Sequence, residues 1–326
     1  MTAAPALVIP AATARRGRFA PSPTGPLHVG SLIAAVASCC DARHGGGQWL
    51  VRIEDVDVPR SRAGAERAIL AALERYGFAL DGPVVRQSER TALYAQALAA
   101  LAAAGVAYEC ACTRREQETA RVGAAGERVY PGTCRHGIPP DRAQRRQRAW
   151  RVRIGADSGS TVVAYDDRCF GRVAQDLVRD AGDFVVRRAD GYFAYQLAVV
   201  VDDAAASVTD VVRGADLATS TPRQIFLQRL LGLPTPSYLH VPVAIDACGA
   251  KLSKETRAAA LPADPMPALV AAWRFLGQAL PSGSGTPASV AEFWAFAIAA
   301  WNPARLPRVA ALPVDARFGP RSPAPV

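Results

Sequence analysis

A proline- and glycine-rich loop between a short strand and a long helix is the feature that most constrains the fold of this chain. A strand is predicted at residues 17–20, the loop at 21–26 and the helix from about 28 to 43. Tight Pro/Gly turns let backbone approach a ligand closely, and a helix N-terminus attracts phosphate. The segment therefore predicts the phosphate-binding start of a nucleotide-binding domain.

Polar side chains follow this loop and the next predicted strand. His28 and Ser31 share one helix face and could both reach an ATP phosphate or ribose, although His28 alone would be explained as an exposed residue. A strand at 48–53 brings Glu54 to its C-terminal end, the edge where open α/β sheets bind ligands. Helices predicted at 61–76 and 90–104 complete the first half of a doubly wound unit.

The chain is expected to be an α/β protein with a doubly wound, Rossmann-like parallel sheet. From residue 106 cysteines, glycines and arginines interrupt the strand and helix pattern, which returns at 192–201, 208–212 and 221–231. We therefore predict a flexible N-terminus at 1–16, the first half of a nucleotide-binding domain at 17–105 and an insertion at 106–188. The second half follows at 189–255, and a short helical C-terminal region at 256–326.

The insertion contains three closely spaced cysteines. Cys110 and Cys112 are separated by one residue, and Cys134 follows. Thiolates at this spacing can share one tetrahedral, structural Zn²⁺. Spacing leaves the fourth ligand open between Tyr130 and His136, and three unconnected buried cysteines are the alternative.

Net charge and cysteine content indicate what kind of partner the protein binds and in which cellular compartment it works. Lys and Arg outnumber Asp and Glu by 38 to 29, which favours an anionic partner such as RNA. The basic run at 142–153 predicts either phosphate contacts or a solvated strand. An odd number of cysteines, no secretory pattern and no stretch of about 20 apolar residues predict a soluble, cytoplasmic protein with no membrane partner, expected to be a monomer.

Two segments resemble signatures of the class I aminoacyl-tRNA synthetases. Residues 18–31 read RFAPSPTGPLHVGS, which is similar to the HIGH-type signature in its glutamyl form. Residues 251–255 read KLSKE, which resembles the mobile KMSKS loop whose lysines neutralise charge on the ATP triphosphate as pyrophosphate leaves. Leu252 replaces Met with little consequence, whereas Glu255 replaces the final Ser and its hydroxyl contact.

The resemblance implies a set of site residues for ATP with Mg²⁺, for L-glutamate and for zinc. Catalysis is assigned to His28, Ser31, Lys251 and Lys254, and ATP binding to His28, Gly30, Ser31, Ser253 and Lys254. Glutamate contacts are assigned to Arg18, Ala20, Ser22, Glu54, Tyr195 and Arg213. Zinc ligands are assigned to Cys110, Cys112, Tyr130 and Cys134. In this assignment arginines hold carboxylates by paired hydrogen bonds, Glu54 receives the α-ammonium and Tyr195 closes the site.

Val199 departs from the pattern of the family. It is apolar where full-length glutamyl enzymes are expected to have a polar side chain, so fewer carboxylate contacts are expected.

Within this class the chain is similar to the glutamyl-queuosine tRNA(Asp) synthetase family, which has the zinc insertion and no anticodon-binding domain. The short C-terminal region agrees with that family. The resemblance implies activation of glutamate by ATP and its transfer to queuosine at the wobble position of tRNA(Asp). Two alternatives are a compact glutamyl-tRNA synthetase that charges the 3′ end of tRNA(Glu) and a noncatalytic tRNA-binding paralogue.

Overall fold

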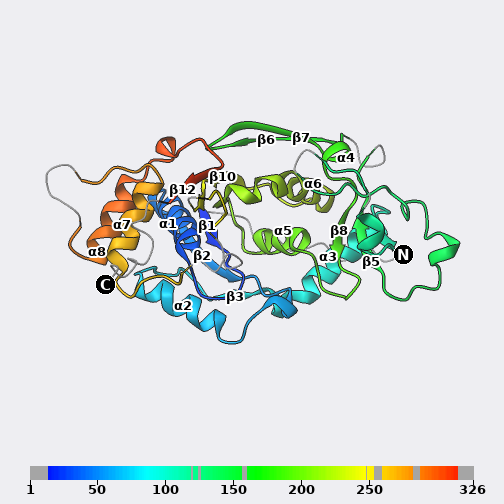
Figure 1. The fold of residues 1–326 in the computed structure, drawn as a ribbon, viewed down its shortest axis with the longest axis horizontal. Helices are drawn as coiled ribbons and strands as arrows, with labels where there is room; N and C mark the ends of the chain where they lie inside the picture. Colours follow the sequence, from blue (N-terminus) through cyan, green and yellow to red (C-terminus); the bar gives the residue numbers. More distant parts are fainter. Residues whose placement is uncertain are drawn as a thin grey trace.

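A largely parallel sheet assembled from both halves of the chain forms the centre of the structure (Figure 1). The computed structural model describes residues 14–118, 120–123, 126–155, 160–246, 248–252, 259–281 and 287–314. Within these ranges the main sheet has seven strands in the order β3-β2-β1-β9-β10-β6-β7. Their bounds are β1 (Arg16–Phe19), β2 (Gln48–Ile53), β3 (Val85–Arg86), β6 (Val162–Asp167), β7 (Gly171–Asp176), β9 (Asp210–Gly214) and β10 (Ser237–Val241). Every neighbouring pair is parallel except β6 and β7, which are antiparallel.

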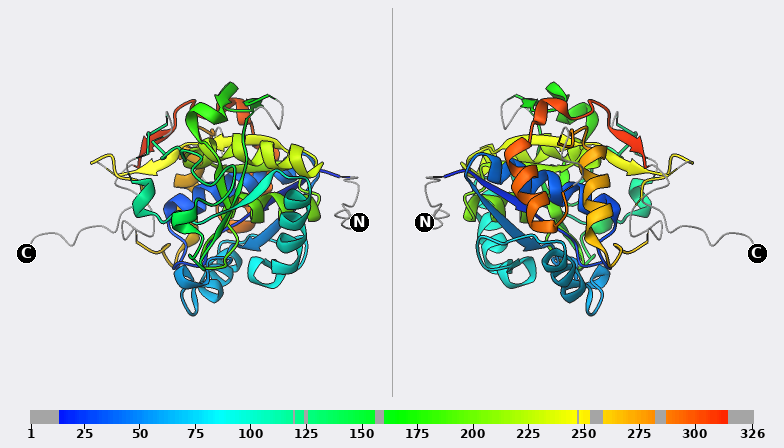
Figure 2. Two further views of the ribbon diagram at one scale, coloured as in Figure 1. Left: turned by 90° about the vertical axis from the view of Figure 1, so that its right-hand side faces the viewer. Right: turned by 90° about the vertical axis from the view of Figure 1, so that its left-hand side faces the viewer.

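Helix α1 (Val29–His44) is the central helix of the N-terminal half, and it lies directly against β1. A Cβ on Gly17 would lie 2.8 Å from the Cβ of Ala42, so only glycine allows this approach of strand and helix. On the other side of α1 pack α7 (Pro265–Phe275) and α8 (Val290–Ala300), drawn in orange in Figure 2. These two helices are the helical C-terminal part that was predicted. Together with α2 (Ala65–Arg75) they bury one apolar core.

A second apolar core lies under the other half of the sheet. Its helices are α3 (Thr91–Ala103), α5 (Tyr195–Ala205) and α6 (Thr221–Leu231). Helix α6 ends at Gly232, whose φ of 64° is the left-handed conformation that favours glycine at a helix C-terminus. Both helices also bury polar residues, among them Asp202 and Asp203 of α5 and Gln224 and Gln228 of α6.

The segment predicted as an insertion contributes to two sheets. A separate antiparallel sheet joins β4 (Ala107–Cys110), β5 (Ala149–Val152) and β8 (Phe184–Arg187). Between β5 and β8 the chain leaves this sheet to form the β6–β7 hairpin, which pairs with β10 at Asp167 and Tyr238 and is followed by α4 (Leu177–Asp180). A two-stranded sheet of β11 (Val243–Ile245) and β12 (Ala311–Pro313) completes the described strands.

The predicted α/β fold with a parallel central sheet is confirmed, and most element ends agree within a few residues. The strand predicted at 48–53 is β2 itself, and the predicted first strand is shifted by one residue to Arg16–Phe19. Of the predicted flexible N-terminus, residues 1–13 lie outside the described residues, and Arg15 bonds to Asp41 and Asp210. Among the described residues, no helix has the length and apolar character needed to cross a membrane.

Candidate active site

The predicted phosphate-binding loop runs from β1 to the start of α1 as expected. His28 caps α1, and its Nδ1 accepts a hydrogen bond from the backbone N–H of Ser31 at 3.4 Å. The carbonyl of Pro21 accepts a bond from the N–H of Glu54 at 3.0 Å, which ties this loop to the end of β2. Two segments that are separate in the sequence are thereby held side by side at the C-terminal edge of the sheet.

A cavity of about 510 Å³ opens above this loop, and we call it the loop cavity. Among its lining residues are Ala20, Ser22, His28, Gly30, Ser31, Gly214, Asp216, Lys251 and Leu252. The structure thus brings both signature segments, more than 200 residues apart, to one cavity. Such a cavity at the C-terminal ends of parallel strands, with a helix N-terminus in its wall, can hold a nucleotide.

Lys251 and Leu252 place the start of the second signature segment. The Nζ of Lys251 lies 2.6 Å from Asp216 Oδ2, and the N–H of Leu252 bonds to the carbonyl of Ala244 at 2.8 Å. A Cβ on Gly30 would come within 3.0 Å of the Leu252 carbonyl, so this position accepts little more than glycine. The other predicted residues of the segment, Ser253, Lys254 and Glu255, lie outside the described residues.

Four of the residues predicted to bind the amino acid form what we call the inner cluster: Arg18, Glu54, Tyr195 and Arg213. They are adjacent, since the charges of Arg213, Glu54 and Arg18 all act on the Tyr195 hydroxyl, whose pKa is raised mainly by burial. Burial also raises the pKa of Glu54, against the charges of Arg52 and Arg18. A bound ammonium group would reverse that shift, so the cluster can pair with both ends of an amino acid.

Buried carboxylates hold the arginines of the inner cluster. Asp203 on α5 accepts bonds from Arg18 Nε at 3.3 Å and from Arg52 Nη1 at 2.6 Å. Arg52 Nη2 also bonds to Glu54 Oε1 at 3.2 Å. Although burial alone would raise it, the charges of Arg18 and Arg52 lower the pKa of Asp203. One carboxylate therefore fixes two arginines and, through Arg52, the side chain of Glu54.

Arg213 has a different set of partners. Its guanidinium donates to Tyr195 Oη at 3.1 Å, to Thr221 Oγ1 at 2.8 Å and to His240 Nε2 at 3.2 Å. His240 Nδ1 in turn lies 2.6 Å from Asp167 Oδ2. Val199, the position expected to be polar in full-length glutamyl enzymes, is buried in the apolar core.

Four residues beside the inner cluster were not predicted from the sequence: Arg52, Asp167, Asp203 and His240. A usable signal existed for Asp203, because a pair of aspartates in an otherwise apolar helix requires buried partners. For Asp167 and His240 there was none, since their proximity depends on the pairing of β6 with β10. Nothing in the sequence pattern around Arg52, which lies two residues before Glu54, marks it as a site residue.

The three predicted zinc ligands do meet in the structure. The Sγ atoms of Cys110, Cys112 and Cys134 all lie within 4.8 Å of one another. Tyr130 Oη is 3.2 Å from Cys110 Sγ and 3.5 Å from Cys112 Sγ. Against the effect of burial, the Tyr130 hydrogen bond and the charge of Arg151 hold the pKa of the Cys110 thiol below its ordinary value. Soft thiol ligands gathered in this way fit Zn²⁺.

Of the two candidates for the fourth ligand, Tyr130 is the one at the cysteines. Its ring is buried, and the guanidinium carbon of Arg151 lies 3.8 Å from the ring centroid. His136 is exposed and is not among the residues whose ligand atoms form the cysteine cluster. Tyr130 therefore fits the predicted ligand set better than His136.

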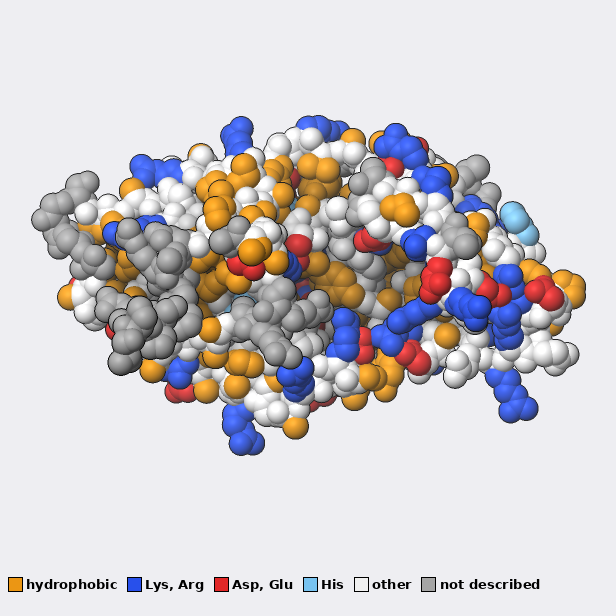
Figure 3. Space-filling model, viewed as in Figure 1, with side chains coloured by type: hydrophobic (Ala, Val, Ile, Leu, Met, Phe, Trp, Pro, Cys, Tyr) orange, Lys and Arg blue, Asp and Glu red, His pale blue; other side chains and the backbone are white. Residues whose placement is uncertain are grey.

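A larger cavity, of about 920 Å³, lies beside the cysteine cluster, and we call it the insertion cavity. Five arginines line it: Arg114, Arg145, Arg146, Arg151 and Arg188. Arg188 bonds to Asp57 at 2.6 Å, which ties one wall of this cavity to the segment that follows β2. Figure 3 shows basic and acidic side chains gathered over the half of the molecule that carries β5 and β8.

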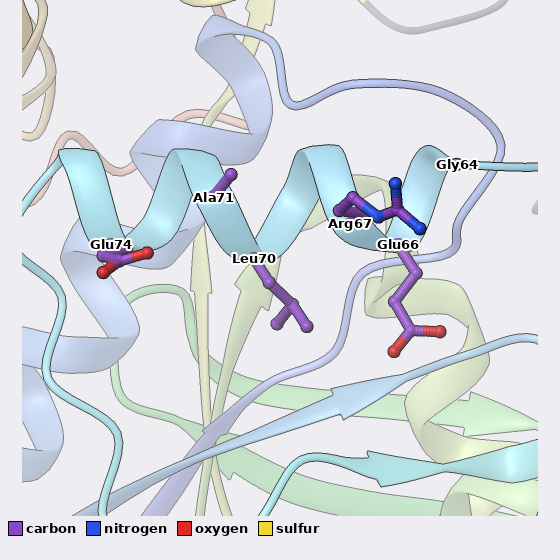
Figure 4. Close-up of a pocket in the computed structure, with 6 residues that line it drawn as sticks. All are labelled: Gly64, Glu66, Arg67, Leu70, Ala71 and Glu74. Atoms are coloured by element: carbon purple, nitrogen blue, oxygen red, sulfur yellow. The ribbon is translucent and has the colours of Figure 1, made fainter.

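A hollow along α2 contains none of the predicted site residues. Its lining is drawn in Figure 4 and comprises Gly64, Glu66, Arg67, Leu70, Ala71 and Glu74. Glu66 pairs with Arg86, and Glu74 and Ala71 are exposed. We therefore place the functional site at the loop cavity and the inner cluster.

The fold and this site together define the catalytic domain of a class I aminoacyl-tRNA synthetase. The family described as tRNA synthetases class I (E and Q), catalytic domain, matches residues 15–267. A glutamate-tRNA synthetase from Elizabethkingia anophelis has the same fold, with a TM-score of 0.75 and 24% identity over 94% of this chain and 69% of that one.

Curated relatives define the family more narrowly. The chain is 56% identical to the glutamyl-Q tRNA(Asp) synthetase of Burkholderia mallei, over 95% of this chain and 99% of the relative. It is also 56% identical to the protein of that name from Dechloromonas aromatica, over 90% and 96%. The chain therefore belongs to the glutamyl-Q tRNA(Asp) synthetase family of class I tRNA synthetases and is a ligase.

Proposed function

We propose that this enzyme activates L-glutamate with ATP and transfers it to queuosine at the wobble position of tRNA(Asp). The observation that carries the proposal is the position of the inner cluster next to the loop cavity. Arg18 and Arg213 supply charge for the carboxylates of glutamate, and Glu54 supplies it for the ammonium. The names of the relatives support queuosine in tRNA(Asp) as the acceptor.

In the first step a glutamate α-carboxylate oxygen attacks the α-phosphorus of ATP. The bond between the α- and β-phosphates breaks, and pyrophosphate leaves with glutamyl-AMP formed. His28 and Ser31 at the start of α1 and Lys254 stabilise the charge that develops on the phosphates, and Mg²⁺ accompanies the ATP. In the second step a hydroxyl of the queuosine cyclopentenediol attacks the carbonyl carbon, loses its proton and displaces AMP.

Lysine usage supports the role of the second signature segment. Of 38 basic residues, 36 are arginine, and the two lysines are Lys251 and Lys254. Arginine presents a planar fork, whereas lysine presents a compact charge on a flexible stem. A chain that uses arginine at its other basic positions has lysine where a compact point charge has to neutralise a leaving pyrophosphate.

Glutamate-dependent exchange of pyrophosphate into ATP, measured without RNA, tests the activation step. We expect exchange with glutamate and none with aspartate or glutamine. Reductive methylation with formaldehyde and a borohydride modifies amines, and the lysine amines of this chain are those of Lys251 and Lys254, so it should lower exchange unless ATP protects. Absence of exchange in the untreated enzyme would favour the noncatalytic alternative.

The insertion supports the RNA step. Its arginine-lined cavity offers cations for RNA phosphates, and a Zn²⁺ held by three cysteines and Tyr130 would fix the chain segments that carry Arg114 and Arg145. Labelled glutamate should be transferred to an anticodon stem-loop bearing queuosine and not to the same stem-loop with guanosine. Labelling of the tRNA(Glu) 3′ end alone would instead identify a compact glutamyl-tRNA synthetase.

A further inference from the structure

A row of three side chains crosses neighbouring strands of the main sheet at the inner cluster. Asp167 ends β6, His240 lies on β10, and Arg213 on β9 is the register partner of His240. The Asp167 and His240 side chains are completely buried. Asp167 Oδ2 lies 2.6 Å from His240 Nδ1, and His240 Nε2 lies 3.2 Å from Arg213 Nε. A carboxylate, an imidazole and a guanidinium are thus connected in sequence.

Hydrogen-bond chemistry fixes where the imidazole proton lies. A guanidinium nitrogen only donates, so Nε2 of His240 has to present its lone pair to Arg213. The ring proton is then on Nδ1, where it is donated to Asp167. A protonated imidazole would point an N–H at the Arg213 N–H and add a second positive charge beside it. Thr221 Oγ1 also lies 3.2 Å from Nε2, and its hydroxyl can donate there while it accepts from Arg213. The arrangement is therefore satisfied by a neutral imidazole in the Nδ1–H tautomer.

We propose that Asp167 and His240 are positioning residues that set the orientation of Arg213 for glutamate. The inference rests on the proposed function, because it takes Arg213 as a carboxylate ligand. Asp167 holds the His240 tautomer, and His240 holds the Nε edge of the guanidinium. Neither residue contacts the substrate in this scheme.

The donor inventory of Arg213 agrees with this role. A guanidinium has five N–H groups, and Arg213 uses three for His240, Tyr195 and Thr221. Among the described residues no partner is found for the other two N–H groups, and two is the number that a bidentate contact with one carboxylate uses. If the Nε edge were released, the guanidinium could turn about its stem and lose the alignment of that pair.

Asp167 is itself held in a fixed orientation. Its Oδ1 accepts the backbone N–H groups of Cys169 at 2.9 Å and Phe170 at 3.0 Å, and Oδ2 accepts the backbone N–H of His240 at 3.2 Å. In Asp167→Asn the amide oxygen would stay on the two hairpin N–H groups, and the NH₂ group would face His240. The imidazole would then accept at Nδ1 and carry its proton on Nε2, against Arg213.

The test compares glutamate KM, ATP KM and kcat in pyrophosphate exchange for His240→Gln, His240→Leu and Asp167→Asn. Gln can place an amide oxygen near the Nε2 position, whereas Leu offers no acceptor. We expect His240→Leu and Asp167→Asn to raise glutamate KM on the order of tenfold or more, with ATP KM changed less than about threefold. His240→Gln should restore most of the affinity. His44→Leu, remote at the end of α1, is the control.

Thermal unfolding shows whether each variant is folded, and a tautomer measurement shows whether the imidazole proton has moved. Histidine ¹⁵N NMR should show the Nδ1–H tautomer for His240 in the enzyme and its loss in Asp167→Asn. Folded variants whose glutamate KM stays within about threefold of the unmodified enzyme would overturn the proposal, as would a His240→Gln variant no better than His240→Leu. If the unmodified enzyme itself shows no glutamate-dependent exchange, the proposed function fails, and not only the positioning role of Asp167 and His240.

Discussion

Arginine side chains dominate both the inner cluster and the insertion cavity, but their surroundings differ. Arg18 and Arg213 of the inner cluster, and Arg52 beside it, are at most 5% exposed, and each bonds to protein groups. In the insertion cavity Arg151 is buried and Arg145 and Arg188 form ion pairs. Arg114 and Arg146 of that cavity are exposed and make no ion pair within the described part of the chain. Buried charges need built-in partners, whereas exposed charges stay available for a polyanion and are screened by salt. The difference indicates a rigid site for a small ligand beside an adaptable surface for RNA.

The largest effect is expected from removing Asp203, the carboxylate that pairs with the buried arginines. Asp203→Leu would leave Arg18 and Arg52 without their shared carboxylate, so we expect a loss of about 3 to 5 kcal/mol in the free energy of unfolding, measured with urea. Glutamate-dependent exchange should be lost with it. Asp166→Leu is the matched control, because its partner Arg172 is also exposed and little change is expected. Similar stability losses in the two variants would contradict the comparison.

The next largest effect is expected at Lys254 of the second signature segment. Lys254→Ala should lower the rate of adenylate formation on the order of 10²-fold, because the ammonium acts on charge that exists only in the transition state. Lys254→Arg retains the charge but not its compact shape, and should remain impaired. Pyrophosphate exchange measures both, with folding checked by thermal unfolding. An unchanged exchange rate in Lys254→Ala would remove the lysine from catalysis.

The third prediction concerns zinc at the cysteine cluster, which borders the insertion cavity. About one Zn²⁺ per chain is expected by elemental analysis of protein purified without added metal. Tyr130→Phe should lose that metal to a chelator faster than the unmodified enzyme, and His136→Ala should not. Metal loss should also reduce transfer to RNA more than pyrophosphate exchange, since the cysteine cluster borders the insertion cavity and not the loop cavity. The opposite order of the two variants would make His136 the ligand.

The exposed arginines should matter for RNA and not for activation. Arg114→Ser combined with Arg146→Ser should weaken binding of the stem-loop on the order of tenfold at low salt. It should also reduce the slope of log affinity against log salt by roughly 0.7 to 0.9 per arginine. Exchange without RNA should be unchanged. Arg172→Ser, on the edge hairpin, is the control. A salt slope equal to that of the unmodified enzyme would exclude this cavity as the RNA surface.

What could be predicted from the sequence differs between these regions for a physical reason. The loop around His28 and the spacing of Cys110 and Cys112 are local patterns, so both the phosphate-binding fold and the meeting of the cysteines could be predicted. Asp203 and His240 act through partners on distant elements, and a single sequence does not show which strands will be neighbours. The same limit explains why the β6–β7 hairpin was not separated from the insertion.

The smallest effect expected is the pH dependence of folding stability that His240 contributes. It tests the protonation state of the buried residues around Arg213. Burial lowers the pKa of His240 from its ordinary value of 6.5, as does the charge of Arg213, while Asp167 and Asp216 oppose the shift. A lowered pKa means that the unfolded chain binds the proton first. Stability from this residue is therefore fully present above pH 6.5 and is lost as the pH falls toward the folded pKa, by at most about 1.4 kcal/mol per pH unit.

Urea unfolding of the unmodified enzyme and of His240→Gln at pH 7.5, 6.5 and 5.5 measures this contribution, because the difference between the two cancels the titrating groups that do not contact His240. Glu54 is one of those groups, and its raised pKa acts with the opposite sign: the stability it contributes is lost as the pH rises. Asp167, whose pKa is lowered from 3.8, loses its contribution only in more acid solution. The unmodified enzyme should therefore lose more stability than His240→Gln between pH 6.5 and 5.5. Parallel curves would mean that His240 accepts a proton as readily in the folded state as in the unfolded chain, which a lone pair committed to Arg213 does not allow.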